Sequence, residues 1–124
     1  MSVDTKKKVI AFIDDLMFRS KVNAAAKALS LDVEYIRDFA GIEKSLEASR
    51  PCLMVLDLHI KSLDPLQTIK LLKSKPGLSD VPLLGYFSHV QDDLKKMAEE
   101  AGCDTVLPRS KFSADLTNIL GKYA

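Results

Sequence analysis

The sequence has no hydrophobic run long enough to cross a membrane and almost no excess of charge. Its apolar stretches fall well short of the roughly 18 residues that a membrane helix needs. The formal net charge is +1, from 18 basic and 17 acidic side chains. Nucleic-acid binding relies on many uncompensated Lys and Arg contacts to phosphates. We therefore expect neither a membrane nor a nucleic acid among the partners of this protein.

Cysteine is scarce, with two residues, Cys52 and Cys103, far apart in the sequence. Each lies at or beside the start of a predicted strand, so we interpret both as buried free thiols. Free thiols are typical of a reducing compartment. The first eight residues are polar, and the apolar run behind them is too short for a signal peptide. We therefore expect a cytoplasmic protein.

The sequence also lacks the common motifs of nucleotide, zinc and hydrolase chemistry. It has no glycine-rich phosphate loop, no Cys and His spacing for zinc, and no Ser, His and Asp arrangement. Hydrophobic residues make up 47% of the chain and charged residues 28%, a balance typical of a globular protein with a buried core. At 124 residues, the chain fits a single domain over residues 1–124.

Two short apolar runs each end in acidic residues. Residues 9–13 lead into Asp14 and Asp15, and residues 53–56 lead into Asp57. Such runs are typical of buried parallel strands, and open parallel sheets bind their ligands at the carboxyl edge. Acids that converge there from two strands indicate a divalent cation, beside which Asp57 could accept a phosphoryl group. The alternative is a set of solvated acids stabilised by helix dipoles.

Apolar runs alternate with segments of helical period along the chain. Strands are predicted at residues 9–13, 32–37, 53–56, 81–87 and 105–108, and helices at about 16–29, 42–48, 65–75, 91–101 and 113–123. Asp64 and Ser113 are expected to cap the helices that follow them. Five strand-helix repeats without a linker predict an α/β domain with a parallel sheet in the order 2-1-3-4-5 and helices on both faces.

Several short motifs occur in a familiar order. They are the acid pair at 13–15, the run at 55–58, Asp64 in the loop that follows, Val81-Pro82 at the start of the fourth strand, and the turn at 101–104. With these motifs the chain resembles the receiver domains of two-component response regulators over nearly all of its length.

The resemblance implies a flavodoxin-like fold and phosphorylation on Asp57. It further implies Mg²⁺ held by Asp14, Asp15 and Asp57 and by the backbone carbonyl of His59. A histidine kinase or phosphotransfer protein would donate the phosphoryl group, and a downstream partner protein would receive the signal. Any activity of the chain itself would be limited to self-phosphorylation and self-dephosphorylation at Asp57.

The sequence departs from the receiver pattern at three positions. Phe87 stands where receivers place a Ser or Thr, and Ser88, one residue later, would point into the site only if the strand bulges or has already ended. Arg109 replaces the usual Lys, which keeps the charge but changes a point donor into a planar fork. Val106 replaces an aromatic residue. Loss of one donor to a developing oxyanion slows chemistry by about 10²–10³, so phosphorylation would be impaired rather than forbidden.

Two functions therefore stay open. The first is a stand-alone phosphoacceptor receiver, in which Arg109 and Ser88 assist Asp57. The second is a pseudo-receiver, a protein-binding module that works without phosphorylation. A phosphatase or dehalogenase with an Asp nucleophile is disfavoured, because it would typically need a second acid at the position of His59. In either open case the chain would act through a partner protein.

Overall fold

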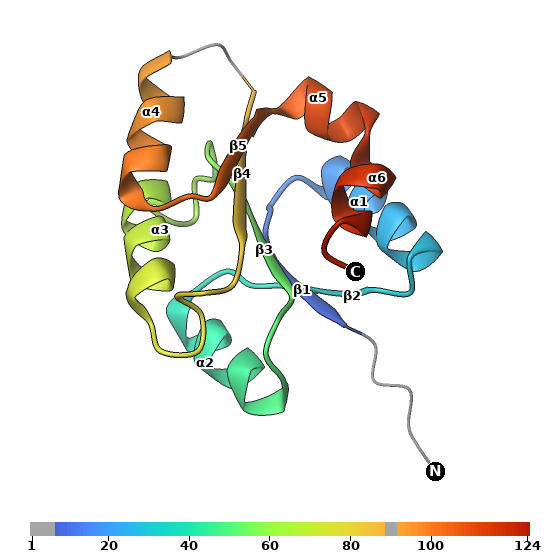
Figure 1. Ribbon diagram of the computed structural model, residues 1–124, viewed down its shortest axis with the longest axis horizontal. Helices are drawn as coiled ribbons and strands as arrows, with labels where there is room; N and C mark the ends of the chain where they lie inside the picture. The colour runs from blue at the N-terminus through green and yellow to red at the C-terminus, as the bar shows by residue number, and fades with distance from the viewer. Residues whose placement is uncertain (1–6, 89–91) are drawn as a thin grey trace.

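A five-stranded sheet forms the centre of the computed structural model, which describes residues 7–88 and 92–124 (Figure 1). The strands are β1 Lys8–Phe12, β2 Asp32–Tyr35, β3 Leu53–Asp57, β4 Leu83–Phe87 and β5 Thr105–Pro108. All neighbouring strands are parallel, and their order is β2-β1-β3-β4-β5. The predicted sheet is therefore confirmed.

Helices cover both faces of the sheet, as predicted (Figure 1). One face carries α1 Leu16–Ala28, α5 Arg109–Ala114 and α6 Leu116–Gly121, and the other carries α2 Phe39–Ala48, α3 Pro65–Ser74 and α4 Asp92–Ala101. Strand side chains alternate between two separate cores. Ile10 packs in the core under α2, α3 and α4, whereas Val9 packs in the core under α1, α5 and α6. No helix among the described residues is long and apolar enough to cross a membrane.

Aspartate caps set the starts of α2 and α3. Asp38 accepts a hydrogen bond from the Gly41 amide at 2.8 Å, which starts α2 three residues before the predicted position. Asp64 accepts one from the Gln67 amide at 3.1 Å, as predicted for a cap. Pro65 follows as the first residue of α3, where its missing N–H leaves no helical bond unmade.

The C-terminal helix differs from the prediction of one helix over 113–123 capped by Ser113. α5 begins at Arg109, directly after β5, and Ser113 lies inside it. A break at Asp115 separates α5 from α6. The reason for the early start is Phe112, which is fully buried in the core of this face. The chain must turn helical before Ser113 to bring that ring onto the sheet.

The remaining differences from the predicted elements are small shifts at the ends of strands. β2 ends at Tyr35, two residues before the predicted end, and β4 begins at Leu83 rather than at 81. The predicted start of the fourth helix, Gln91, lies outside the described residues. Both cysteines are free, as predicted; Cys103 is buried, which raises its pKa to about 11, and Cys52 is partly buried.

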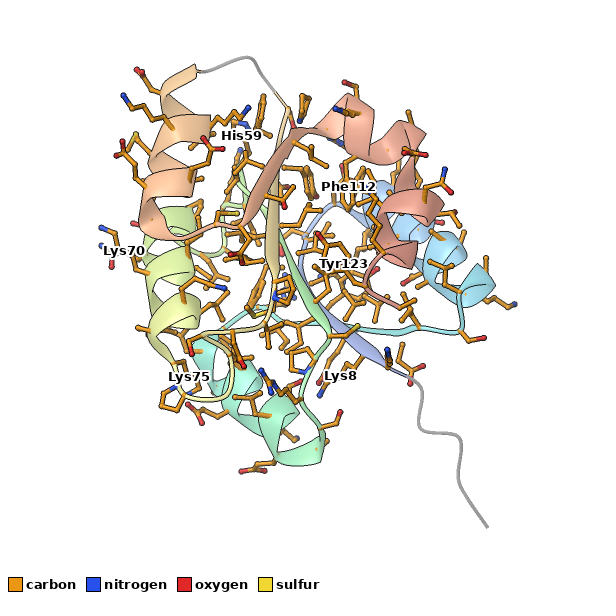
Figure 2. All side chains as sticks on the ribbon, in the orientation of Figure 1. Lys8, His59, Lys70, Lys75, Phe112 and Tyr123 are labelled. Atoms are coloured by element: carbon orange, nitrogen blue, oxygen red, sulfur yellow. The ribbon has the colours of Figure 1, made fainter. Side chains whose placement is uncertain are left out.

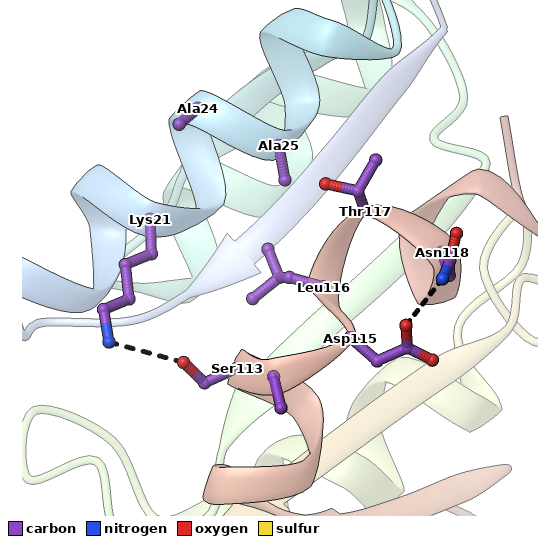
Figure 3. A pocket seen from close by; sticks show the side chains of 9 residues that line it. Lys21, Ala24, Ala25, Ser113, Asp115, Leu116, Thr117 and Asn118 are labelled. Atoms are coloured by element: carbon purple, nitrogen blue, oxygen red, sulfur yellow. Dashed lines mark hydrogen bonds between the residues drawn. The ribbon is translucent and has the colours of Figure 1, made fainter.

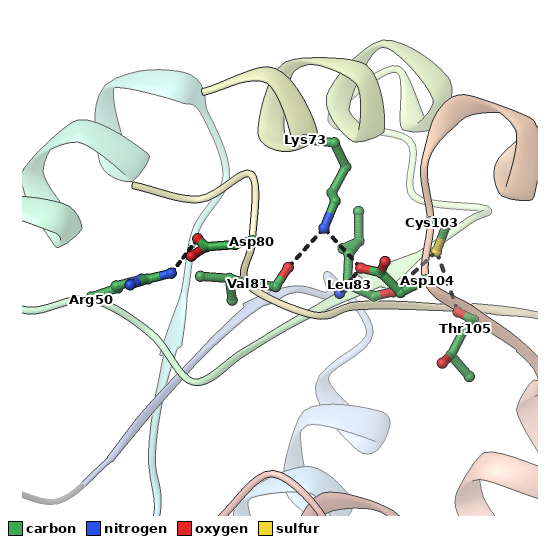
Figure 4. Close-up of polar contacts among 8 residues, drawn as sticks. All are labelled: Arg50, Lys73, Asp80, Val81, Leu83, Cys103, Asp104 and Thr105. Carbon is green, nitrogen blue, oxygen red and sulfur yellow. Dashed lines mark hydrogen bonds and ion pairs between the residues drawn. The ribbon is translucent and has the colours of Figure 1, made fainter. Parts of the chain in front are cut away.

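Polar contacts tie the amino edge of the sheet together (Figure 4). Asp104 Oδ2 accepts hydrogen bonds from Lys73 Nζ at 2.8 Å and from the Leu83 amide at 2.9 Å. Lys73 Nζ also donates to the Val81 carbonyl at 3.0 Å. These bonds connect α3 with the starts of β4 and β5, at the end of the sheet opposite to the predicted site.

Candidate phosphoacceptor site

Asp57 is the last residue of β3, at the carboxyl edge of the sheet. Figure 2 shows His59, two residues later, at the end of the molecule opposite to Lys8. Asp57 Oδ1 accepts a hydrogen bond from the His59 amide at 2.9 Å. Partial burial raises the pKa of Asp57 above its ordinary value; the His59 amide and Arg109 oppose this rise, and the negative charge of Asp14 adds to it. The surroundings of Asp57 therefore disfavour the ionised form of its carboxyl group.

Asp14 and Asp15 follow β1, but their surroundings differ. Asp15 is exposed and caps α1, because its Oδ1 accepts from the amides of Met17 at 2.9 Å and Phe18 at 3.2 Å. Its Oδ2 accepts from Arg109 Nη2 at 2.9 Å. These amides and the guanidinium lower the pKa of Asp15. Asp14 is partly buried, and its Oδ1 is enclosed without a hydrogen-bond partner among residues 7–88 and 92–124.

Arg109 connects the start of α5 with the start of α1. Besides pairing with Asp15, its guanidinium lies over the ring of Phe18, with Cζ 4.9 Å from the ring centre. Arg109 was expected at the site only because of the resemblance to receivers. Its pairing with Asp15 spans 94 positions of the chain, and no local sequence pattern signals it.

The residues present fit a divalent cation in part. No three His, Cys, Asp or Glu side chains gather closely enough to hold a metal ion within the described part of the chain. Asp14 offers an enclosed carboxylate oxygen without a partner, and Asp57 is the charge beside it. These two carboxylates suit an oxygen-seeking cation. Asp15 already caps α1 and pairs with Arg109. Coordination of a cation by the His59 carbonyl stays a prediction.

The positions that depart from the receiver pattern are filled by packing. Phe87 is 9% exposed and Val106 is 6% exposed, and both belong to the core under α2, α3 and α4. Ser88 follows the end of β4 and is exposed. The strand therefore ends before Ser88 without a bulge, and the role of its hydroxyl in the site stays a prediction.

Tyr86, which was not among the predicted site residues, is a further polar residue that the fold brings to this edge. Tyr86 pairs in register with Asp57. Its ring stacks on Phe18 with centroids 4.8 Å apart and lies 5.5 Å from the ring of Phe112. The hydroxyl is buried without a hydrogen-bond partner among the residues described. Strand alternation could have found it, because neighbouring positions of β4 face opposite cores.

A hollow of about 530 Å³ lies between α1 and the segment formed by α5 and α6 (Figure 3). Lys21 Nζ meets Ser113 Oγ across it at 3.4 Å. Asn118 Nδ2 donates to Asp115 Oδ1 at 2.7 Å beside it. None of the predicted site residues lines this hollow, so it is separate from the acidic edge.

The sequence matches no protein-family model, and no curated protein is significantly similar to it. Its structure is similar to that of the phosphorylated cyanobacterial phytochrome response regulator RcpA, with a TM-score of 0.77 and 20% identity over 95% of this chain and 91% of that one. The chemotaxis response regulator CheY4 of Vibrio cholerae gives a TM-score of 0.79 and 17% identity over 97% and 100%.

A third similar structure is the receiver domain of a sensor histidine kinase from Pseudomonas aeruginosa PAO1, with a magnesium ion coordinated in its active site cleft. The TM-score is 0.78 at 17% identity over 96% of this chain and 98% of that one. The chain has the receiver fold. In a receiver fold of this strand order, Asp57 ends the central strand, and Asp14 and Asp15 follow the strand beside it.

Proposed function

We propose that this chain is a receiver that accepts a phosphoryl group on Asp57 and signals through a partner protein. The observation that carries the proposal is the pair formed by Asp57 and Asp14. Burial and the neighbouring charge raise the pKa of Asp57, and Asp14 Oδ1 is enclosed without a partner among the described residues. A pair of this kind is stabilised by a bound cation rather than by the protein alone, and the cation would also allow an anionic phosphoryl group to approach.

The transfer step follows from the contacts of Asp57. Its Oδ1 is held by the His59 amide, so Oδ2 forms the new bond to phosphorus while the bond between phosphorus and the donor breaks. The leaving group, a histidine nitrogen when the donor is a histidine kinase or phosphotransfer protein, takes a proton from water. Mg²⁺ held by Asp14 and Asp57 would offset the charge of the carboxylate and the phosphoryl group. Arg109 adds a second positive charge at this edge.

A pseudo-receiver is the second candidate, and three observations favour it. Phe87 and Val106 are packed in the core where a receiver would carry its hydroxyl and aromatic residues. Arg109 is bound to Asp15 rather than directed at Asp57 alone. A module of this kind would keep the receiver fold and bind its partner without phosphorylation.

Incubation with a small phosphodonor and Mg²⁺, followed by intact-mass measurement, tests the proposal. We expect the mass of one phosphoryl group on the unmodified chain and none on Asp57→Asn. Asp64→Asn is the matched control. It changes another acid, the cap of α3, and asparagine remains a good cap. It should be phosphorylated like the unmodified chain.

Absence of the added mass would contradict the proposal. Thermal melting then separates the two candidates further, because a cation that binds the folded state raises the melting temperature by mass action. A melting temperature that Mg²⁺ shifts equally in the unmodified chain and in the Asp14→Asn, Asp57→Asn double variant would favour the pseudo-receiver.

A further inference from the structure

Tyr86 occupies a special place in the sheet. It is the residue of β4 that pairs with Asp57 of β3, and paired residues of parallel strands direct their side chains to the same face. Its ring is enclosed between Phe18 of α1 and Phe112 of α5, at centroid distances of 4.8 and 5.5 Å. Tyr86 therefore shares its face of the sheet with the phosphoacceptor, and its ring position is fixed by two aromatic neighbours.

The hydroxyl of Tyr86 lacks what a buried hydroxyl normally has. The residue is 1% exposed, and its oxygen finds no hydrogen-bond partner in the described ranges 7–88 and 92–124. Buried polar atoms in folded proteins are nearly always paired, so an unpaired one needs an explanation. Packing alone does not supply one, because phenylalanine would fill the same space between Phe18 and Phe112 without the penalty.

The charges that influence this hydroxyl come from the same edge of the sheet as Asp57. Burial raises the pKa of Tyr86 far above its ordinary value, the negative charges of Asp57 and Asp15 raise it further, and Arg109 opposes them. These are the charged residues of the carboxyl edge. The phenol therefore keeps its proton. It can donate a hydrogen bond to an acceptor group at the carboxyl edge.

The neighbouring residues of β4 leave the donor position open. Phe87 has no hydroxyl, and its side chain belongs to the opposite core. Ser88 is exposed after the end of the strand. Asp57 itself accepts a hydrogen bond from the His59 amide on Oδ1. A phosphoryl group on the other oxygen would add three strong acceptors to this edge.

We propose that the Tyr86 hydroxyl donates a hydrogen bond to the phosphoryl group carried by Asp57. This assignment rests on the proposed function and adds a phosphoryl-binding residue to it. The hydrogen-bond donor would then be Tyr86, on the face of the sheet covered by α1 and α5. Receivers carry their hydroxyl one residue later, at the position of Phe87. Phosphoryl binding would thus involve a residue of the ring cluster formed by Phe18, Tyr86 and Phe112.

Titration with beryllofluoride and Mg²⁺, a mimic of the phosphoryl group, tests the assignment by calorimetry. Tyr86→Phe should weaken beryllofluoride binding about 10- to 100-fold, as expected for loss of one hydrogen bond to a charged group. Its melting temperature without ligand should be unchanged or higher, because the substitution removes only an unpaired polar atom. Its affinity for Mg²⁺ alone should be unchanged, because the hydroxyl serves the phosphoryl group.

Tyr35→Phe is the matched control. Its hydroxyl donates to Asn23 Oδ1 at 2.7 Å and lies 3.1 Å from the Arg19 carbonyl, away from the acids. This variant should lose stability without ligand and bind beryllofluoride normally, the reverse of Tyr86→Phe.

Equal beryllofluoride affinity in Tyr86→Phe and the unmodified chain would overturn the assignment and leave the proposed function standing. Equal loss of beryllofluoride and Mg²⁺ affinity would also overturn it, because the hydroxyl would then act on the cation site. An unmodified chain that binds Mg²⁺ but no beryllofluoride would overturn the assignment and the proposed function together.

Discussion

At the scale of single residues, Arg109 would oppose a cation bound among the carboxylates of this edge. The guanidinium pairs with Asp15 at 2.9 Å, and its charge opposes the rise that burial causes in the pKa of Asp57. A positive ion that approaches Asp57 would meet repulsion from Arg109, and Asp15 is already paired with that guanidinium. A phosphoryl group, by contrast, is attracted by the same guanidinium. The residue therefore opposes the cation and favours the anion.

Arg109→Ala should consequently strengthen Mg²⁺ binding and weaken beryllofluoride binding. The gain for Mg²⁺ should be about two- to fivefold, in keeping with the modest energy of partly exposed ion pairs. Calorimetric titration measures both affinities, and NMR titration of the Asp15 carboxyl group should show its pKa rising toward the ordinary value.

Arg109→Lys is the control, because it keeps the charge and loses the planar fork. It should change Mg²⁺ affinity less than Arg109→Ala does. Unchanged Mg²⁺ affinity in Arg109→Ala would show that the ion pair with Asp15 does not restrain the site.

At the scale of elements, the last two residues of β4 lie in opposite cores. Tyr86 faces α1 and α5, and Phe87 faces α3 and α4. The core that holds Phe87 also holds Val106 of β5. Apolar packing of this kind is insensitive to the charge on Asp57. We therefore expect phosphorylation to leave the position of α4 unchanged.

We therefore predict small amide shift changes when beryllofluoride and Mg²⁺ bind the unmodified chain, confined to the carboxyl edge. Phe87→Thr combined with Val106→Tyr should extend the changes to α4 and β5, because a hydroxyl and a mobile ring replace fixed packing. Loss of the buried ring should cost about 2–4 kcal/mol of the free energy of unfolding. Heteronuclear NMR and urea denaturation measure the two effects.

Phe87→Leu serves as the control, because it keeps an apolar side chain and adds no hydroxyl. Its shift changes should stay local. Changes that already reach α4 and β5 in the unmodified chain would show that the protein switches by another route.

The elements themselves were largely predictable, whereas their contacts were not. Short apolar runs that end in acids identified β1 and β3 and placed Asp57 at the carboxyl edge. Asp64 and Pro65 identified the start of α3. The start of α5 was misplaced, because Ser113 looks like a cap and only tertiary burial of Phe112 requires an earlier helix. The pairing of Asp15 with Arg109 likewise depends on the fold, since the two residues lie 94 positions apart.

At the scale of the whole molecule, the two edges of the sheet are built differently. The amino edge pairs its polar groups, whereas the carboxyl edge keeps Asp14 Oδ1 and the Tyr86 hydroxyl without partners among the described residues. Because the folded-state pKa of Asp57 is raised, its ionisation lowers stability as the pH rises from the unfolded pKa through the folded one. The carboxyl edge thus gives up stability that a bound cation would restore.

The amino edge should accordingly contribute stability without affecting the site. Asp104→Ala removes the acceptor of the buried Leu83 amide and of Lys73 Nζ. It should lower the free energy of unfolding by about 1–3 kcal/mol, the cost of leaving such groups without a partner. Urea denaturation measures the loss, and Mg²⁺ and beryllofluoride affinities should stay those of the unmodified chain.

Asp80→Ala is the matched control on the same edge, because Asp80 pairs with Arg50 in an exposed position (Figure 4). Solvent screens a pair of this kind, so its removal should leave the urea midpoint essentially unchanged. Equal destabilisation by the two substitutions would show that the contacts of Asp104 with Leu83 and Lys73 are worth no more than a surface ion pair. A loss of Mg²⁺ affinity in Asp104→Ala would show instead that the two edges are coupled through β4 and β5, and that stability and binding are not divided between them.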